Sequence, residues 1–229
     1  GDVIYVRAGT YTSFDWSSDS DIKLVGEDRE TTIIDGSGYS YGIEIQGDEI
    51  NYRVDHNTLI QGFTIQNGLA RSGAGIYCEN SSPLLKGLLV KNNEANDENW
   101  SHGGGISFNS GSSRLENSII TGNYAGNQGG GIYLVNSNPS MVDLYIMNNS
   151  TTYDGGGIFC NSSNPTIENS IITNNVVGNG GGGIYCASSS SPSLNNVTIA
   201  GNFANNNTGG IWLHSSSISI NNSILNNSK

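Results

Sequence analysis

Short apolar segments recur along the chain, and turn-forming glycine, asparagine and serine residues separate them. The clearest segment follows a run of glycines, as in GGGIYC, which ends at Cys186. The isoleucine of this motif recurs at Ile76, Ile106, Ile132, Ile158, Ile184 and Ile211. The intervals between these positions are 30, 26, 26, 26 and 27 residues. A period of this size is typical of repeat architectures, so the chain is predicted to consist of stacked copies of one unit.

Two further apolar segments occur in each period. One follows a Ser-Pro or Asn-Pro pair, as in SPSL from Ser191, and the other ends in asparagine, as in SIITGN to Asn123. Each segment is shorter than a stable helix requires, and its β-branched content and alternation favour a strand. The inward side chains are expected to stack into three apolar columns. The columns are the motif isoleucines, then Leu85, Leu115, Met141, Ile167 and Leu194, and then Val90, Ile120, Ile146, Ile172 and Ile199.

Three short strands per period predict an all-β fold, a single-stranded parallel β-helix (solenoid) of about eight coils of roughly 26 residues. We expect one domain over residues 1–229, with irregular coils in 1–72 and regular GGGI repeats in 73–229. The segments YGIEIQG and TLIQGFTIQNG supply one early coil, and DVIYVRAGTY, DIKLVGE and TTIIDGSG supply another. Longer turns are expected at residues 11–21, 47–57 and 94–102.

The opening IYVRAGTY…IKLVGEDRETTIIDG resembles the N-terminal coil of right-handed parallel β-helix proteins, a superfamily that includes pectate lyases and many surface proteins. The GGGI and I-x-x-N motifs are similar to the repeats of polymorphic outer-membrane adhesins, whose motifs are GGA-[ILV] and F-x-x-N. In this chain glycine replaces the alanine, and isoleucine or valine replaces the phenylalanine. The resemblance covers essentially the whole chain and implies a right-handed parallel β-helix. It implies little about function, because one fold hosts many functions.

Composition narrows the classes of partner. Only 13% of the residues are charged and the formal net charge is −11, which argues against nucleic acid or an anionic membrane as a partner. No apolar run reaches the length of a transmembrane helix. The chain begins without methionine, so we expect a processed mature form or a fragment. The acidic, Asn/Ser/Gly-rich composition favours an extracellular or cell-surface location. No cofactor is indicated; calcium is left open.

The glycine runs and the recurring asparagines are interpreted as structural. A phosphate-binding loop needs a lysine after the glycines, and a calcium-binding nonapeptide repeat needs a nine-residue period; neither occurs. The glycines are expected to form tight turns where positive φ is required. One asparagine per coil is expected to form a hydrogen-bonded ladder and to adopt the left-handed conformation at a corner. These residues are Asn93, Asn123, Asn149, Asn175 and Asn202.

The three cysteines lie two residues after the motif isoleucine, at Cys78, Cys160 and Cys186. This position points inward, so they are expected to act as small buried apolar residues. Cys160 and Cys186 lie on adjacent coils, and a disulfide between them is an alternative that depends on strict geometry. Converging ligands for a metal are not apparent.

The residue between the two inward positions points outward in a strand. It is aromatic in most coils, which gives five candidate ligand-binding residues: Tyr77, Tyr133, Phe159, Tyr185 and Trp212. An exposed aromatic stripe suggests a contact surface for sugar rings or for a protein. The alternative is that stacked aromatics stabilise neighbouring strands.

The segment ANDENWSHG gives the second candidate site, with Asp97, Glu98, Trp100 and His102 in one loop. A solvated turn is the alternative interpretation. Other acidic residues, such as Asp55 and Asp154, fall mainly in turns. A glycosidase needs two carboxylates placed across a cleft, and the sequence identifies no catalytic residue.

These features favour a non-catalytic, secreted or surface-displayed β-helix with an adhesive, carbohydrate-contacting or structural role. A glycan or a surface protein is the expected partner. The alternative is a polysaccharide lyase or glycoside hydrolase that acts on an extracellular glycan. The coil edges at both ends lack an amphipathic capping helix, so either flanking sequence is missing or copies associate head to tail into a filament.

Overall fold

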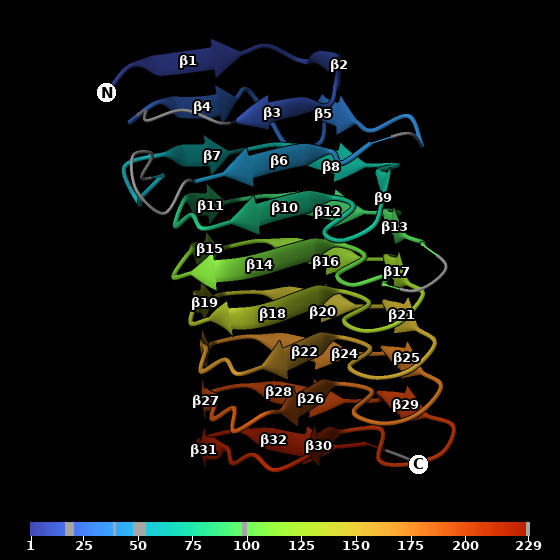
Figure 1. Cartoon of the computed structure of the whole chain (residues 1–229). Coiled ribbons are helices and arrows are strands. Elements are labelled where there is room, and N and C mark those ends of the chain that lie inside the picture. The colour runs from blue at the N-terminus through green and yellow to red at the C-terminus, as the bar shows by residue number, and fades with distance from the viewer. Residues whose placement is uncertain (17–20, 39, 48–53, 98–99, 228–229) are drawn as a thin grey trace.

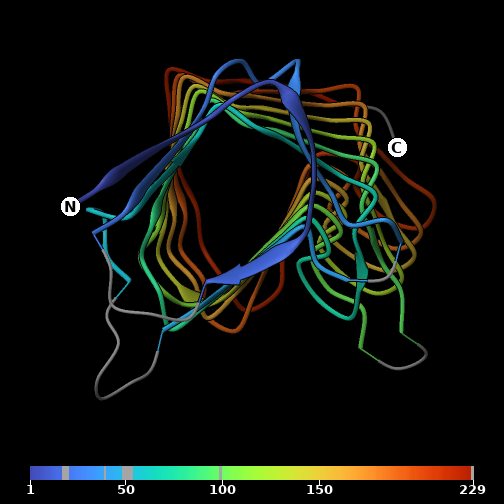
Figure 2. The same ribbon diagram turned by 90° about the horizontal axis from the view of Figure 1, so that it is seen from above.

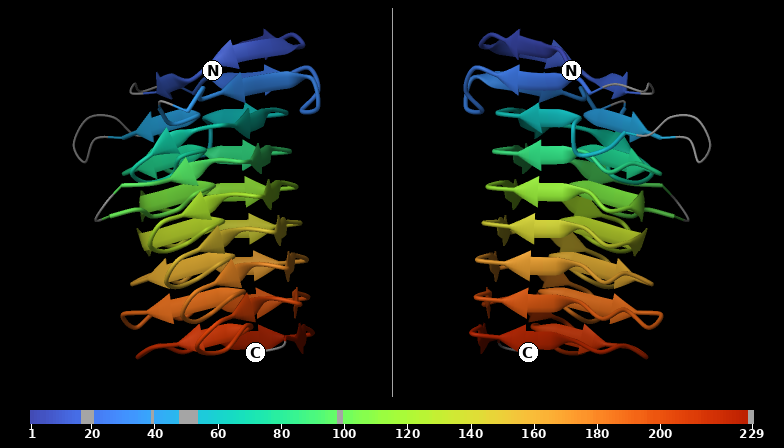
Figure 3. Two further views of the ribbon diagram at one scale, coloured as in Figure 1. Left: turned by 90° about the vertical axis from the view of Figure 1, so that its right-hand side faces the viewer. Right: turned by 90° about the vertical axis from the view of Figure 1, so that its left-hand side faces the viewer.

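The computed structural model describes residues 1–16, 21–38, 40–47, 54–97 and 100–227. Its short strands wind into a stack of coils, and the ladders between named strands are parallel (Figures 1 and 3). No helix occurs among these residues. The predicted all-β parallel solenoid is therefore confirmed.

Three sheets, A, B and C, run the length of the stack. Sheet A contains β1 (Val3–Val6), β4 (Lys23–Gly26), β7 (Leu59–Gln61), β11 (Leu84–Lys86), β15 (Arg114–Glu116), β19 (Ser140–Val142), β23 (Thr166–Glu168), β27 (Ser193–Asn195) and β31 (Ser219–Asn221). Sheet B contains β2 (Gly9–Thr12), β5 (Thr32–Asp35), β8 (Thr64–Gln66), β12 (Leu89–Lys91), β16 (Ile119–Thr121), β20 (Tyr145–Met147), β24 (Ile171–Thr173), β28 (Thr198–Ala200) and β32 (Ile224–Asn226). Sheet C contains β3 (Phe14–Trp16), β6 (Ile43–Gln46), β10 (Ile76–Glu79), β14 (Ile106–Gly111), β18 (Ile132–Ser137), β22 (Ile158–Asn161), β26 (Ile184–Ala187) and β30 (Ile211–Leu213).

The three predicted core columns form between these sheets. Ile106 pairs with Ile132 in sheet C, and Leu115 pairs with Met141 in sheet A. In sheet B, Ile120 pairs with Ile146. The column residues are fully buried, apart from Ile211, which is partly buried at the last strand of sheet C. Because each column repeats one apolar position per coil, the core is continuous along the axis.

The number of coils agrees with the sequence analysis. In the described part of the chain, sheet C has eight strands and sheets A and B have nine, which makes eight complete coils and the start of a ninth. The assignment of the first segments was wrong. DVIYVRAGTY contains both β1 and β2, which pair with β4 and β5, so it belongs to an earlier coil than DIKLVGE and TTIIDGSG. The turn expected at 11–21 contains the end of β2 and all of β3.

The asparagine ladder is confirmed and extends to Asn227. Within it, Asn149 Nδ2 donates to Asn175 Oδ1 of the next coil at 3.0 Å and to the Ile120 carbonyl of the preceding coil at 3.0 Å. The backbone N–H of Asn149 also donates to Asn175 Oδ1. The expected conformation was wrong by one residue, because positive φ occurs just before the ladder, at Asn148 (56°) and Asn174 (54°). The ladder side chain points inward, and the residue before it makes the corner.

A fourth sheet, D, was not predicted. It contains β9 (Leu69–Ala70), β13 (Glu94–Ala95), β17 (Tyr124–Ala125), β21 (Ser150–Thr151), β25 (Val176–Val177) and β29 (Phe203–Ala204). Each strand follows the ladder position and leads into the glycine run, so sheet D and its loops form a lobe on one side of the coils (Figure 2). The inward residues of sheet D are small, and Ala74, Ala95 and Ala125 form a separate buried cluster there.

The glycine run allows the chain to fold back over sheet C. Gly129 has φ of 68°, and a Cβ there would lie 2.7 Å from the Ile132 carbonyl oxygen and 2.9 Å from Tyr133 Cβ. Gly131, the third glycine, would place a Cβ 2.6 Å from the Gly157 carbonyl oxygen and 3.0 Å from Asn149 Nδ2. Glycine is therefore required by conformation at the first position, and at the third by the close approach of the next coil's backbone and of the ladder.

The cysteines are buried, as predicted. Cys160 and Cys186 are register neighbours on β22 and β26, and both are free thiols, as is Cys78. The thiols interact, and this hydrogen bond together with burial raises the pKa of Cys160 well above its usual value.

Apolar side chains are exposed at both end coils. They include Ile4 and Tyr5 on β1 and Leu225 on β32, and the first coils surround an apolar cavity of about 420 Å³. Among the described residues, no helix has the length and apolar character needed to span a bilayer.

Candidate functional site on the outer face of sheet C

The predicted aromatic stripe lies on the outer face of sheet C, but the lobe covers much of it. Tyr133 is 8% exposed and Phe159 is 2% exposed, so the exposure expected for these residues was wrong. Tyr77, Tyr185 and Trp212 are partly buried. The rings form a stacked row, with centroids 5.5 Å apart for Tyr133 and Phe159 and 5.0 Å apart for Phe159 and Tyr185. The covered part of the row stabilises the lobe rather than presenting a free surface.

The cover consists of the loops that lead from sheet D to sheet C. These loops stack on one another through parallel bridges that join Ser72, His102, Gln128, Asp154 and Gly180 in order. Sequence analysis missed this arrangement, because it treated the glycine run as a simple turn between two outer strands.

His102 contributes a ring to the aromatic row. Its imidazole lies 4.5 Å from the Tyr133 ring at an interplanar angle of 12°, and Tyr133 is the register partner of Ser107 on β14. Burial, with a smaller contribution from Arg71, lowers the pKa of His102 to about 4. His102 Nδ1 is the one buried side-chain nitrogen or oxygen without a hydrogen-bond partner among the described residues. The ring is therefore neutral near pH 7 and acts mainly by stacking.

The structure places the described residues of the predicted loop site in different surroundings. Trp100 is 58% exposed, and its ring lies 6.1 Å from His102 in an edge-on arrangement. Asp97 is exposed, and its backbone N–H donates to Ser101 Oγ at 2.6 Å. Glu98 lies outside the described residues. The loop thus brings Trp100 and His102 together, while His102 is directed toward Tyr133 of the next coil.

A group of carboxylates lies on the outer face of sheet C near the N-terminal end of the stack. Asp15 on β3 is the register partner of Glu44 on β6, and Glu79 on β10 is the partner of Gln46 on β6. Asp15 is exposed, and Glu44 and Glu79 are partly buried. Sheet D begins at β9, after β3 and β6 in the chain, so no described sheet D strand accompanies these two strands. This end of sheet C is the more open one.

Two tyrosines adjoin the carboxylates. The Tyr41 and Tyr77 rings stack with centroids 5.4 Å apart and an interplanar angle of 26°. Asn109 Nδ2 donates to Glu79 Oε1 at 2.9 Å and to the Tyr77 hydroxyl at 3.4 Å. Burial raises the pKa of Tyr77 to about 12, so its hydroxyl stays protonated and can donate a hydrogen bond. We call Asp15, Tyr41, Glu44, Tyr77 and Glu79 the acidic site.

The pKa of the Glu44 carboxyl group is raised. Burial raises the pKa of Glu44, and the charges of Asp15 and Glu79 add to the rise, although Gln46 Nε2 donates to Glu44 Oε1 at 2.6 Å and opposes it. Asp15, Trp16, Glu44 and Gln46 line a hollow of about 130 Å³. In the described residues, no group of three or more His, Cys, Asp or Glu side chains is arranged to hold a metal ion.

Sequence reasoning missed the acidic site, although its signal is present in the printed chain. The three carboxylates occupy outward strand positions in FDW, IEIQ and IYCE, on strands of sheet C. Because β3 was taken for part of a turn, Asp15 could not be placed beside Glu44. The middle residue of Phe14–Trp16 also breaks the aromatic pattern that drew attention to later coils.

The fold has counterparts among known proteins. The family model described as "Right handed beta helix region" matches residues 10–202. No curated protein matches the chain. The solved structure of ORF18 from Geobacillus virus E2 aligns with a TM-score of 0.43 and 13% sequence identity, over 98% of this chain and 52% of that one. This chain therefore spans about half the length of that protein. By the family match over most of its length, the chain belongs to the right-handed β-helix family.

Proposed function

We propose that this β-helix is a secreted or cell-surface protein that binds glycan at the acidic site, in an adhesive role. The observation that carries the proposal is the stacked Tyr41–Tyr77 pair beside partly exposed carboxylates. Aromatic rings offer an apolar face to a sugar ring, and carboxylate oxygens accept hydrogen bonds from its hydroxyl groups.

Electrostatics favours a neutral or basic glycan at this site. Burial raises the pKa of Glu44, and the neighbouring charges of Asp15 and Glu79 raise it further. An anionic polysaccharide would add more like charge. Burial also raises the pKa of Tyr41, and Arg71 lies close enough to oppose that rise, so one cation borders the site and can contact a polar substituent.

A glycan array followed by titration calorimetry tests the proposal. We expect the wild-type chain to bind at least one neutral or amino sugar polymer, and Tyr41→Ala and Glu44→Gln to weaken that binding about tenfold or more. Thr166→Ala is the matched control, because Thr166 is exposed on the outer face of sheet A. Equal binding by all four proteins would place the ligand elsewhere.

Glycoside hydrolysis is the second candidate, and the raised pKa of Glu44 favours it. A carboxyl group that stays protonated at higher pH can act as a general acid, and Asp15 is the second carboxyl group beside it. The test is release of reducing ends from the bound glycan. Glu44→Gln and Asp15→Asn should each abolish turnover if the acidic site is catalytic, whereas binding without turnover supports the adhesive role.

Head-to-tail association stays a prediction of the sequence. The apolar side chains exposed at both end coils, such as Ile4 and Leu225, are those that a second copy or flanking sequence would cover. Sedimentation velocity over a range of concentrations distinguishes a filament, which lengthens with concentration, from a monomer.

A further inference from the structure

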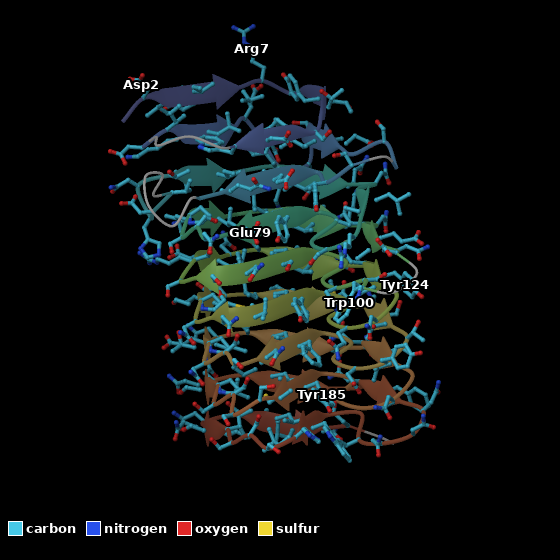
Figure 4. The ribbon with its side chains drawn as sticks, viewed as in Figure 1. Asp2, Arg7, Glu79, Trp100, Tyr124 and Tyr185 are labelled. Atoms are coloured by element: carbon cyan, nitrogen blue, oxygen red, sulfur yellow. The ribbon has the colours of Figure 1, made fainter. Side chains whose placement is uncertain are left out.

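We propose that the lobe carries a second binding surface, for an uncharged polysaccharide, on the outer face of sheet D and its adjoining residues. This lobe surface is defined by Tyr124, Tyr153, Val176 and Phe203, all of them exposed, in the four lobe segments 122–131, 148–157, 174–183 and 201–210. It involves different residues from the acidic site and does not depend on it. Figure 4 labels Tyr124 on the lobe and Glu79 of the acidic site over sheet C.

Strand register aligns the apolar side chains of the lobe. The first residue of each sheet D strand points outward and pairs with its equivalent in the next coil, as Val176 does with Phe203. These two side chains are 46% and 41% exposed. The full row is Leu69, Glu94, Tyr124, Ser150, Val176 and Phe203. It forms a line parallel to the axis of the coils.

The clustering is specific to the lobe and its immediate flank. Among the described residues, the other exposed large apolar side chains lie earlier in the lobe, on sheet B and in the two end coils, at Leu69, Trp100, Tyr145, Val3, Ile4, Tyr5, Tyr11, Leu213, Ile220, Ile224 and Leu225. Apart from Tyr145, the exposed large apolar groups of the middle coils therefore lie on the lobe. An apolar patch of this kind marks an interaction site more often than chance.

The charge of the lobe selects the class of ligand. The four lobe segments 122–131, 148–157, 174–183 and 201–210 contain one charged residue, Asp154, whereas the two earlier lobe segments, which hold Leu69 and Trp100, also hold Arg71, Glu94 and Asp97. Asp154 is buried, accepts a hydrogen bond from Asn179 Nδ2 at 2.8 Å, and has a pKa that burial raises. The chain as a whole has a net charge of −11, yet the surface of the four segments is neutral. No lysine or arginine occurs in them to attract an anionic polymer.

Uncharged polar groups accompany the aromatic rings. Asn148, Thr152 and Asn205 are exposed on or beside the sheet D strands, and the Tyr124 hydroxyl lies 3.0 Å from Thr152 Oγ1. Amide and hydroxyl groups both donate and accept hydrogen bonds, which suits a ligand covered with hydroxyl groups. A protein partner is the competing occupant. It is disfavoured because the surface of these four segments offers no charged groups for the electrostatic complementarity that gives protein interfaces much of their specificity.

The repeat of the row suits an extended polymer. Successive coils rise by about 4.8 Å, a distance comparable to the advance of one sugar ring in an extended polysaccharide. Two inward residues of sheet D, Ala95 and Ala125, pack in a buried cluster, and the neighbouring asparagine ladder hydrogen-bonds successive coils, which favours a preformed surface. A preformed surface loses little conformational entropy on binding.

Native-gel affinity electrophoresis tests the proposal with hydroxyethyl cellulose, galactomannan and laminarin as uncharged probes and polygalacturonate as the anionic probe. We expect at least one uncharged polymer, and not polygalacturonate, to retard the wild-type chain. The double variant Tyr124→Ser and Phe203→Ser should bind about tenfold more weakly. Both changes copy Ser150, which occupies the same row in β21, so the fold is expected to persist.

Two controls separate this surface from the acidic site and from general effects. Val142→Ser removes an outward apolar side chain from sheet A and should leave retardation unchanged. The double variant is also compared with its parent in a Glu44→Gln background, where binding at the acidic site is weakened, and should show the same loss of retardation there. The proposal is overturned if no uncharged polymer retards the chain or if the double variant is retarded equally. It is also overturned if the double variant only reduces self-association in sedimentation, since that would assign the lobe to protein contact.

Discussion

The imidazole of His102 stacks on the Tyr133 ring of the following coil, with centroids 4.5 Å apart. Tyr133 pairs in register with Ser107, which has no ring of its own. The covering loop therefore supplies a ring where the strand lacks one. In the next coil the bridged loop residue is Gln128. The strand that follows Gln128 is β18, which carries the aromatic ring of Tyr133 at this position. Loop and strand compensate each other in filling the space beneath the lobe.

This contact predicts a pH dependence of stability. Burial lowers the pKa of His102 to about 4, whereas an unfolded histidine titrates near 6.5. The contribution of His102 is complete above pH 6.5. It declines as the pH falls from about 6.5 toward 4, because the unfolded chain then binds a proton that the folded chain does not.

His102→Gln copies Gln128 and removes this titration. We expect the difference in Tm between the wild-type chain and His102→Gln to change between pH 7 and pH 4.5, with the wild type losing more stability. Groups such as Glu44 and Asp154, whose pKa values burial raises and which give the opposite trend, are present in both proteins and cancel. Parallel Tm profiles would show that His102 titrates normally.

Asn149→Ala should be strongly destabilising. Asn149 donates to Asn175 Oδ1 and to the Ile120 carbonyl, and its own Oδ1 accepts two hydrogen bonds from Asn123. Loss of the side chain leaves buried polar partners unsatisfied, at a cost of about 3 kcal/mol in the free energy of unfolding. Chemical denaturation measures the change. Asn206→Ala, at an exposed position, should change stability by about 0.5 kcal/mol or less.

Substitution of two glycines should affect the free energy of unfolding to different extents. A Cβ on Gly157 would lie 2.6 Å from the Gly183 carbonyl oxygen, so Gly157→Ala should cost about 2 kcal/mol or more. Gly87 has φ of 60°, and a Cβ added there would meet no atom within 4 Å. Asn117 and Asn169 hold equivalent corners with positive φ, so Gly87→Asn should be close to neutral. Chemical denaturation compares the two variants, and a large loss of stability for Gly87→Asn would contradict this assignment of the two glycine roles.

The three thiols should be unreactive in the native protein. Burial raises the pKa of Cys78, and the neighbouring thiol together with burial raises that of Cys160, so little thiolate forms at pH 8. Mass spectrometry after maleimide treatment should show no adduct on the native chain and three adducts after unfolding without a reductant. One adduct after unfolding would instead reveal a disulfide between Cys160 and Cys186.

The sequence was sufficient to predict the core because the motif isoleucines and their companion columns repeat at nearly constant intervals. It was insufficient for sheet D, whose strands are two residues long and lack a periodic apolar pair. A signal was present, since a small residue often occurs two positions after the ladder asparagine, as at Ala95, Ala125 and Ala204.

The candidate site was harder to predict for a related reason. Alternation along a strand shows which side chains leave the core, but it does not show whether another segment then covers them. Tyr133 and Phe159 leave the core and are still buried, because the glycine run carries a loop across them. Asp15 and Glu44 come together through pairing of β3 with β6, and β3 has no glycine run to identify it.

The constant interval between Ile106, Ile132, Ile158 and Ile184 has a consequence for how this molecule can change in length. Each of these coils presents the same ladder asparagine, glycine run and inward columns to its neighbours. In-frame deletion of residues 132–157 would therefore join two compatible surfaces and preserve every register. The shortened rod would bring the acidic site nearer to Phe203 of the lobe surface by about 4.8 Å, so gene duplication or loss of one repeat can adjust the separation of the two proposed binding surfaces in single-coil steps.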